Sequence, residues 1–383
     1  MTPIAINPAP AMTRHLVGKT GVFLEHPVVI LDVGARGGFN AEWGVFGDCL
    51  RVYCFEPDAT ECAKLNATAA ENVIYLPFAL GEKSGPAKLY ETALSASSGL
   101  YRTNMEFFSR LLNRDNARVV GEKTIQVTPL DEAIAQHGVP PVDFVKLDVE
   151  GAELDVLRGG DRCVRSQSLL GVLAEFRFQE EINGSPVFWQ LDAHVRQFGF
   201  RLFGMQFSHQ SRHVLPYEGL QDYRQPSGER FFAYTRHGQV MDGDALYFRD
   251  LLLPANRGIR TAAGVAQLLK AASLFEIYSL NDCAAELIIE NREALAPYVN
   301  CEGLLNLLTP SIRGRNVSYK DYLKEYFNPD PSAVAASTPA ESNDVRYLKA
   351  HVEHLSAELK ATHATISWRI MAPLRWLRRR LRS

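Results

Sequence analysis

The sequence predicts an α/β fold with a mostly parallel sheet, because runs typical of strands alternate with segments of helical spacing. Apolar, β-branched runs bounded by turn residues recur along the first half of the chain. Residues 58–70 and 186–198 have the periodicity of helices, with Asp58 placed to cap the first of them. Strands that alternate with helices form parallel sheets with covered faces. The expected strands are VVILDV (28–33), RVYCFE (51–56), NVIYLP (72–77), VDFVKLD (142–148) and LLGVLAEF (169–176), with residues 200–204 and 230–236 as a closing pair.

Composition excludes several other classes of protein. The chain has 383 residues, of which 46% are hydrophobic and 22% are charged, as expected of globular domains. Its six cysteines lack CxxC spacing, which argues against a disulfide framework or a zinc site. Prolines interrupt the first 15 residues, and no run reaches the ~18 apolar residues of a membrane span. We therefore expect a cytoplasmic protein.

Changes in pattern along the chain predict five regions. An N-terminal extension (1–27) precedes the α/β domain (28–244), and a helical region (245–327) follows it. Residues 328–344 have the composition of a disordered linker, and 345–383 combine a short coiled-coil pattern with a basic tail. Within the α/β domain, an insertion between Gly81 and Pro129 contains two short alternating strands, AKLYET and TIQVT, around a serine-rich stretch. A loop of that length is usually a lid or a binding element.

The segment ILDVGARGGFN ends the first strand with Asp32 and supplies Gly34 and Gly38 before an expected helix. Glycines allow the backbone to approach a ligand, and a helix N-terminus offers free N–H groups. Glu56, 18 residues after Gly38, ends the second strand, where a carboxylate can accept both hydroxyls of a ribose. Arg36 breaks the GxGxxG fingerprint of dinucleotide sites, so a methyl donor fits better. A tight turn without a ligand remains the alternative.

Four segments together resemble the FkbM family of S-adenosylmethionine-dependent methyltransferases, which has the class I fold with a seven-stranded sheet. They are DVGARGG, FEPD, ALGEKSG (79–85) and VKLDVEGAELDVLRG, and the resemblance covers roughly residues 28–236. It implies S-adenosylmethionine as the cofactor, Glu56 as the ribose-binding acid and residues 79–81 beside the adenine. Arg36 stands where class I enzymes more commonly have glycine. The resulting cofactor-binding set is Asp32, Gly34, Arg36, Gly38, Glu56, Ala79, Leu80 and Asp148.

The stretch DFVKLDVEGAELDVL (143–157) brings a cluster of carboxylates to the end of the fourth strand. That end faces the crevice where parallel sheets bind ligands, and alternation along the strand places Lys146, Asp148 and Glu150 on one side. Methyl transfer to a hydroxyl needs alignment and removal of a proton, and Asp148 is the preferred base. Glu150 and Glu175 are further candidates, and Lys146 can tune their ionisation.

Two other carboxylates of this stretch, Glu153 and Asp155, are expected in the first turn of a helix that begins near Gly151. We predict no metal, although Mg²⁺ between Asp148 and a neighbouring carboxylate stays an open alternative.

The tail SWRIMAPLRWLRRRLRS (367–383) carries six arginines and no acid. Its apolar positions share one helical face, which is typical of a helix on anionic lipid. It resembles tails of bacterial glycosyltransferases and methyltransferases from surface-polysaccharide gene clusters. That resemblance implies a carbohydrate or glycolipid acceptor at the inner face of the plasma membrane. No nucleic-acid partner is expected, and a merely solvated tail is the alternative.

Together these features predict an O-methyltransferase that uses S-adenosylmethionine to methylate a sugar hydroxyl in the biosynthesis of surface polysaccharide or glycolipid. The coiled-coil pattern allows a homo-oligomer. Two alternatives remain open: methylation of a small-metabolite or lipid hydroxyl, and a non-catalytic scaffold that binds the donor.

Overall fold

The computed structural model describes residues 4, 6–36, 38–39, 41–220, 222–224, 230–232 and 234–328. Contacts divide the chain into a unit of residues 3–309 and a second unit that begins at Pro310, and each is considered separately. The second unit contains one described helix, α14 (Tyr319–Phe327), which Ser318 caps. The coiled-coil pattern, the basic tail and all but the first residue of the predicted linker lie outside the described residues.

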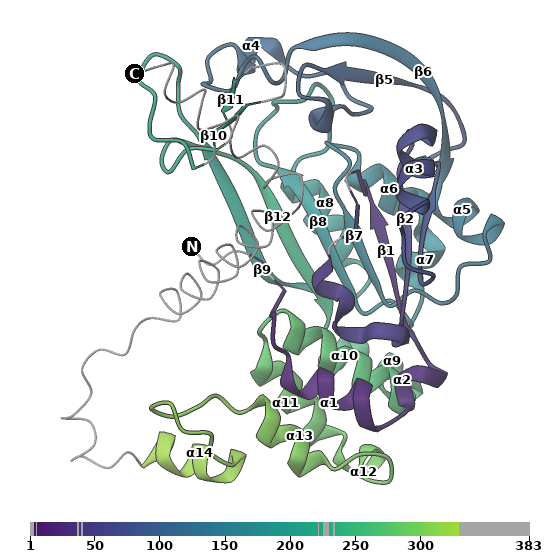
Figure 1. The fold of residues 1–383 in the computed structure, drawn as a ribbon, viewed down its shortest axis with the longest axis vertical. Coiled ribbons are helices and arrows are strands. Elements are labelled where there is room, and N and C mark those ends of the chain that lie inside the picture. The colour runs from purple at the N-terminus through teal and green to yellow at the C-terminus, as the bar shows by residue number, and fades with distance from the viewer. Residues whose placement is uncertain are drawn as a thin grey trace, which may run out of the picture. The chain divides into compact units, whose positions relative to one another are not determined.

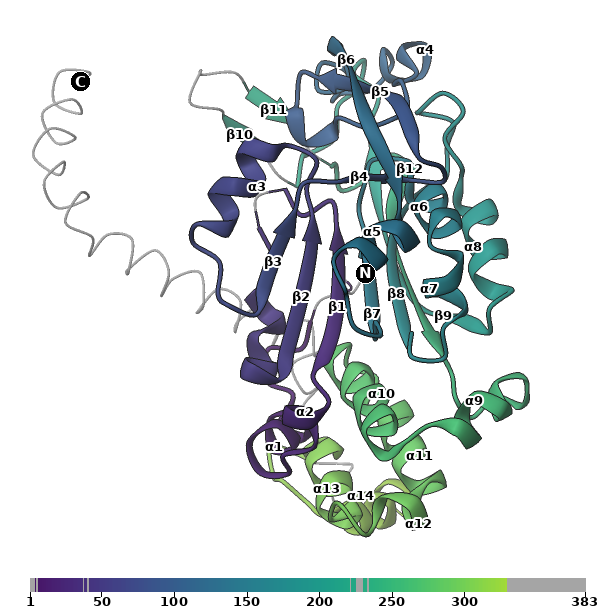
Figure 2. The ribbon, with the colours of Figure 1, turned by 90° about the vertical axis from the view of Figure 1, so that its right-hand side faces the viewer.

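A seven-stranded sheet forms the centre of the larger unit, in the order β3-β2-β1-β7-β8-β12-β9 (Figures 1 and 2). The first five strands of this order run parallel, and β12 is antiparallel to both β8 and β9. The predicted seven-stranded, mostly parallel sheet is therefore confirmed. Its strands are β1 (Val28–Val33), β2 (Leu50–Phe55), β3 (Val73–Leu76), β7 (Phe144–Leu147), β8 (Gly171–Arg177), β9 (Phe200–Gln210) and β12 (Gln239–Arg249).

The predicted closing pair of strands is wrong in its second member. The strand β9 pairs with β12, with Met205 opposite Ala245, whereas among the described residues Arg230–Phe232 (β11) pairs with Asp222–Arg224 (β10) in a separate two-stranded sheet. The strand β12 contains Asp242, Gly243 and Asp244, residues that are depleted in strands, so its alternation is hard to recognise. Its last residues are strand rather than the start of the helical region.

Helices cover the sheet as the alternation predicts. The helix α3 (Ala59–Asn66) has Asp58 as its cap, whose side chain accepts from the backbone N–H groups of Thr60 and Glu61. The predicted helix at 186–198 is α8 (Phe188–Arg196), and α6 (Glu153–Gly159) packs with it. Buried strand residues such as Leu31 and Val172 share one core with Leu154 and Leu191 of these helices. The covering helices α5 (Leu130–Gln136) and α7 (Asp161–Arg165) complete this set.

The expected helix after β1 is not an α-helix. Ala41–Cys49 forms the 3₁₀ segment η1, interrupted at Gly47, whose φ of 52° is not helical. The backbone N–H groups of Gly34 and Ala35 donate instead to the carbonyl oxygen of Phe55, at 3.1 and 3.2 Å. The turn after β1 is thus held against the end of β2, without a helix N-terminus.

The insertion forms a second sheet in the order β4-β6-β5, at the carboxyl ends of the main strands (Figure 1). Its two long strands are the predicted ones, and they pair antiparallel. Between them runs a loop with the short elements η2 and α4. The bounds are β4 (Ala79–Gly81), β5 (Gly85–Thr92), η2 (Ser95–Ser97), α4 (Met105–Phe108) and β6 (Val119–Pro129).

Helices from both ends of the larger unit pack together at the opposite edge of the sheet (Figure 1). Glu276 of α10 accepts hydrogen bonds from the backbone N–H groups of Met12 and Thr13 at the start of α1, at 2.8 and 2.7 Å. Lys270 of the same helix forms an ion pair with Asp143 at 2.7 Å. These helices are α1 (Ala11–Lys19), α2 (Val22–Glu25), η3 (Pro254–Asn256), α9 (Arg257–Ala262), α10 (Val265–Ile277), α11 (Asn281–Glu290), α12 (Arg292–Leu295) and α13 (Cys301–Leu308).

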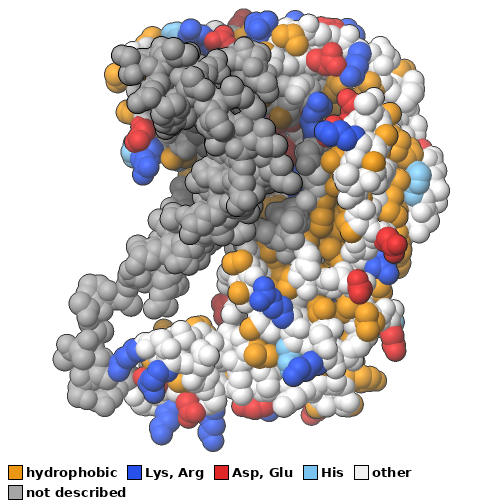
Figure 3. Space-filling model, in the orientation of Figure 1, with side chains coloured by type: hydrophobic (Ala, Val, Ile, Leu, Met, Phe, Trp, Pro, Cys, Tyr) orange, Lys and Arg blue, Asp and Glu red, His pale blue; other side chains and the backbone are white. Residues whose placement is uncertain are grey.

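Charged side chains of both signs are mixed on the visible surface (Figure 3), and the helices do not have the length and hydropathy of membrane spans in the described part of the chain. Outside the grey atoms of Figure 3, basic and acidic side chains are interspersed on the visible face rather than gathered by sign. No helix in the described part of the chain is both long and apolar enough to cross a bilayer.

Candidate functional site

A cavity of about 260 Å³ opens at the carboxyl ends of β1 and β2 and is covered by the insertion. We call it the donor cavity. Its walls include apolar residues of the insertion, Leu89 and Ile125, together with Phe78. Seven of the residues predicted from the sequence also line it, namely Gly34, Arg36, Glu56, Ala79, Leu80, Asp148 and Glu150.

Gly34 sets the shape of the turn at the floor of the donor cavity. Its φ is 87°, and a Cβ atom placed there would lie 1.8 Å from the carbonyl oxygen of Asp148. Only glycine therefore lets the end of β1 approach the end of β7 this closely. Arg36 does not share this demand, because the described non-glycine residues with positive φ are Glu150, Ser279 and Arg313. An arginine in place of the commoner glycine is compatible with this turn.

Glu56 places a carboxylate in the wall of the donor cavity. Only 3% of the residue is exposed, and its Oε1 accepts the backbone N–H of Asp58 at 2.8 Å. Burial raises the pKa of Glu56, while the hydrogen bond from Asp58 and the charge of Arg36 oppose that rise. A buried carboxylate with spare acceptor capacity fits a ligand that brings hydroxyl donors, such as a ribose.

Asp32 and Gly38 lie outside the donor cavity. Both line a neighbouring cavity of about 240 Å³, together with Phe39, Trp43 and Lys146. Asp32 is 6% exposed, and its Oδ1 lies 3.3 Å from Nζ of Lys146. Burial raises the pKa of Asp32, and Lys146 opposes the rise. Among the described residues, Asp32 therefore does not line the donor cavity. It contacts Lys146, which in turn contacts Asp148 of that cavity.

Lys146 connects Asp32 to Asp148, whose Oδ2 lies 3.2 Å from the ammonium. Burial by itself lowers the pKa of Lys146, but the two carboxylates outweigh it and the pKa ends above its usual range. The ammonium therefore keeps its charge and cannot accept a proton. It holds the Asp148 carboxylate at the edge of the donor cavity.

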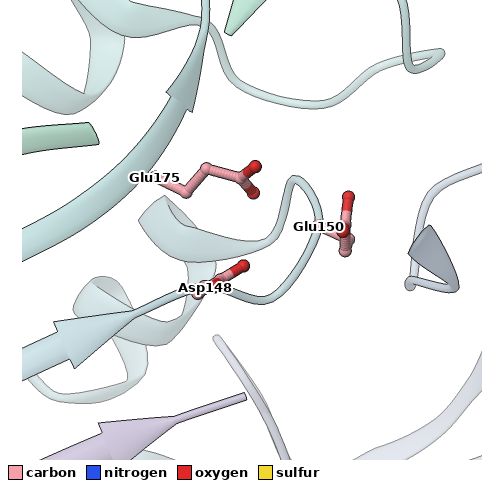
Figure 4. Close-up of side chains that lie close together, drawn as sticks. All are labelled: Asp148, Glu150 and Glu175. Carbon is pink, nitrogen blue, oxygen red and sulfur yellow. The ribbon is translucent and has the colours of Figure 1, made fainter. Parts of the chain in front are cut away.

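Three carboxylates predicted from the sequence meet at this edge (Figure 4): Asp148 just after β7, Glu150 on the following loop and Glu175 on β8. One oxygen of each lies within 4.8 Å of the others. Strand alternation does not place Glu150, because β7 ends at Leu147 and Glu150 has a φ of 56°. A left-handed conformation is uncommon for glutamate and concentrates at functional sites.

Arg177, at the end of β8, is the central cation of the cluster. It is not among the site residues predicted from the sequence. Its guanidinium lies 2.6 Å from Glu150, 3.2 Å from Glu175 and 3.4 Å from Glu181. The signal was an arginine at the end of an apolar run, followed by a pair of glutamates. The three predicted carboxylates present oxygen ligands that suit Mg²⁺, but Arg177 already pairs with two of them.

The two carboxylates expected in the first helical turn are in α6, and Glu153 does more than complement the helix dipole. It is 4% exposed, and its carboxylate accepts the backbone N–H groups of Val149 and Gly151, at 2.9 and 3.1 Å. Asp155 accepts the hydroxyl of Tyr101 at 2.5 Å. Glu153 therefore fixes the loop that carries Glu150, while Asp155 ties the insertion to α6.

Comparison with known proteins agrees with this geometry. The model of the methyltransferase FkbM domain matches residues 32–202. A hexuronic acid methyltransferase, AglP of Haloferax volcanii, is 29% identical over 145 residues, which are 37% of this chain and 54% of that protein. A 2-O-methyltransferase, NoeI of Sinorhizobium fredii, is 24% identical over 174 residues, which are 42% of this chain and 68% of that protein. The chain thus spans about half of the first relative and two thirds of the second.

Similarity to solved structures is weaker. A precorrin-6y C5,15-methyltransferase from Geobacter metallireducens GS-15 has a TM-score of 0.26 and 12% identity, covering 62% of this chain and 87% of that one. A similarity of this size says nothing about the site. The family model covers the glycine turn, Glu56 and the carboxylates at the end of β7, all of which meet at the donor cavity. Residues 32–202 therefore belong to the FkbM family of methyltransferase domains.

Proposed function

We propose that the protein is an S-adenosylmethionine-dependent O-methyltransferase that methylates a sugar hydroxyl of a surface polysaccharide or glycolipid. One observation carries the proposal: the donor cavity is lined by two carboxyl groups that can bind a hydroxyl, Asp148 and Glu150, of which Asp148 can also deprotonate it. The names of the two relatives, a hexuronic acid methyltransferase and a 2-O-methyltransferase, support a carbohydrate acceptor.

The residues of the donor cavity fit the proposed cofactor. When bound, S-adenosylmethionine supplies a methyl group on a positively charged sulfur. Glu56 is placed to accept hydrogen bonds from the ribose hydroxyls. Phe78, Leu89 and Ile125 form an apolar wall that suits the adenine ring. The surplus of carboxylates over cations around Asp148 favours a cationic ligand at this end of the cavity.

Asp148, rather than Glu150, is the proton acceptor in this proposal. Burial raises the pKa of Glu150 to about 8 even with Arg177 beside it, so at neutral pH much of Glu150 keeps its proton. Asp148 is more accessible, with 44% of its side chain exposed, and the charge of Lys146 lies 3.2 Å away. Asp148 therefore takes the proton of the acceptor hydroxyl, while Lys146 orients its carboxylate.

Calorimetric titration with S-adenosylhomocysteine tests the cofactor. We expect micromolar binding to the wild type, a loss of at least tenfold in Glu56→Ala, and no change in Glu71→Ala, a control at an exposed glutamate before β3. Transfer of a radiolabelled methyl group to glycans then tests the reaction. Absence of binding by the wild type would contradict the proposal.

The sequence supports a second element of the proposal outside the described residues: residues 367–383 hold the enzyme against anionic membrane. Flotation with anionic vesicles should recover the full chain in the lipid fraction. A chain that ends at residue 366 should remain in the lipid-free fraction. Equal recovery of both chains would exclude the tail as anchor. A homo-oligomer through residues 345–366 is tested by light scattering on the full chain and on a chain that ends at residue 344.

A further inference from the structure

A second cavity, of about 170 Å³, adjoins the donor cavity and contains most of the cluster around Arg177. Glu150 lines both cavities. The loop at 94–100 also separates them, because Ser95 and Ser98 line the donor cavity while Leu94 and Ser97 line the second one. A ligand in the second cavity would thus lie next to the end of the donor cavity where the methyl group is expected.

The walls of this second cavity contain buried polar groups that lack partners. Gln210, the last residue of β9, is only 1% exposed, and neither atom of its side-chain amide has a hydrogen-bond partner within the described part of the chain. The buried Oδ1 of Asn113 also has no hydrogen-bond partner among the described residues. Unsatisfied buried groups are costly and rare, so they point to a ligand with both donors and acceptors. A sugar hydroxyl acts as both a hydrogen-bond donor and a hydrogen-bond acceptor.

The charges in the second cavity are unequal. Four carboxylates line it, Glu150, Glu175, Glu181 and Asp242, against one cation, Arg177. Arg177 is already paired with three of the four. Burial raises the pKa of Glu181 to about 8 despite Arg177, so burial in this cavity disfavours negative charge. A carboxylate on the ligand would find no free cation among these walls, whereas hydroxyl or ammonium donors would find acceptors.

We propose that the second cavity holds the acceptor sugar ring and that its carboxylates select a neutral or amino sugar over a uronic acid. This inference rests on the proposed function and narrows its substrate class. At about 170 Å³ the second cavity is smaller than the donor cavity of about 260 Å³. The hexuronic acid named for one relative is thus not the acceptor here.

The first experiment compares matched acceptors. Radiolabelled methyl transfer is measured to p-nitrophenyl glucoside, galactoside and mannoside, and to the 2-amino and uronic acid forms of each. We expect transfer to at least one neutral or amino ring, with kcat/KM for its uronic acid form at least tenfold lower. Equal or faster transfer to the uronic acid would overturn the inference and leave sugar methylation standing. Transfer to none of them, with S-adenosylhomocysteine still bound, would contradict the carbohydrate acceptor and this inference with it.

Variants then locate the acceptor. Gln210→Leu should raise KM for the glycoside at least tenfold while the affinity for S-adenosylhomocysteine stays within twofold. The matched control is Gln206→Leu on the same strand, whose amide accepts the backbone N–H of Ile4 and lies outside the cavity. If Gln210→Leu loses donor binding through misfolding, Asn113→Leu replaces it. An unchanged KM in a variant that still binds the donor would place the acceptor elsewhere.

A charge variant tests selection itself. At pH 9, above the pKa of about 8 that burial gives Glu181, Glu181→Gln removes one negative charge and frees part of Arg177, so the preference for the neutral ring over its uronic acid form should fall at least threefold. The control, Glu180→Gln, changes the exposed neighbour and should leave the preference unchanged. A preference that is the same in Glu181→Gln and the wild type would show that these carboxylates do not select the acceptor.

Discussion

At the scale of single residues, two neighbouring carboxylates have different environments although they are two positions apart. Asp148 has 44% of its side chain exposed and lies against a charged lysine, whereas Glu150 has 21% exposed, is left-handed in its backbone and is paired with Arg177. The proposal that Asp148 rather than Glu150 accepts the proton rests on this difference in environment, which residue type alone does not show.

Replacing the proposed base should separate binding from turnover. Asp148→Asn keeps the shape of the side chain but removes its ability to accept a proton, so turnover should fall by on the order of 100-fold. Affinity for S-adenosylhomocysteine, measured by calorimetry, should stay within twofold. Asp161→Asn, in α7 and outside the donor cavity, is the control. Wild-type turnover in Asp148→Asn would remove this residue from the mechanism.

Gly34 is the residue whose backbone conformation matters most for the donor cavity. Gly34→Ala places a Cβ atom against the carbonyl oxygen of Asp148 and strains a positive φ, so we expect a loss of stability on the order of 2–3 kcal/mol and loss of donor binding. Urea unfolding and calorimetry measure the two effects. Gly18→Ala, where a Cβ would meet nothing within 4 Å, should leave both nearly unchanged.

At the scale of elements, the packing of α1 against α10 joins the ends of the larger unit and lies far from the donor cavity. Glu276 of α10 accepts the backbone N–H groups of Met12 and Thr13 and the Thr13 hydroxyl. It is 1% exposed, so its replacement leaves buried donors without an acceptor.

Glu276→Ala should therefore lower the free energy of unfolding by on the order of 3 kcal/mol without changing donor affinity in the folded protein. Urea unfolding and calorimetry at a temperature well below the transition test the two parts. Glu290→Ala, at an exposed position of α11, controls for the loss of a helical glutamate. A large change in donor affinity in Glu276→Ala would show that these helices act on the site.

At the scale of the whole molecule, the cluster around Arg177 makes stability depend on pH. The pKa of Glu181 rises from 4.5 to about 8 on folding, because of burial that Arg177 only partly offsets. Between these values the folded state keeps a proton that the unfolded state has lost. Stability from this group is therefore present below pH 4.5 and is lost as pH rises through about 8.

The free energy of unfolding, measured in urea from pH 5 to 9, should fall with rising pH. In Glu181→Gln the difference between its values at pH 5 and pH 9 should be smaller by on the order of 2 kcal/mol. Glu150, Glu175 and Asp242 contribute in the same direction, since burial raises the pKa of each. Glu180→Gln should keep the wild-type slope. A slope that is identical in Glu181→Gln and the wild type would contradict the raised pKa.

Much of the fold and part of the site could be predicted because they depend on local sequence. Buried parallel strands are continuous apolar runs, so the five parallel strands were recognisable from such runs, and β9 was recognised as the first member of the closing pair. Parallel strands also bring their carboxyl ends to one edge, which explains why Glu56, Asp148, Glu150 and Glu175 could be placed near a common crevice. The glycine turn was recognisable for the same local reason.

What only the tertiary structure decided depends on contacts between distant segments. Arg177 becomes the centre of the cluster because β8 ends beside the loop that carries Glu150, and Asp242 joins it because β12 pairs with β8. The side chain of Gln210 has no hydrogen-bond partner among the described residues because β9 ends at the second cavity, and Asp32 contacts Lys146 rather than lining the donor cavity. Strand pairing and burial set these positions over long sequence separations, so local sequence determines much of the donor cavity while tertiary packing determines the second cavity.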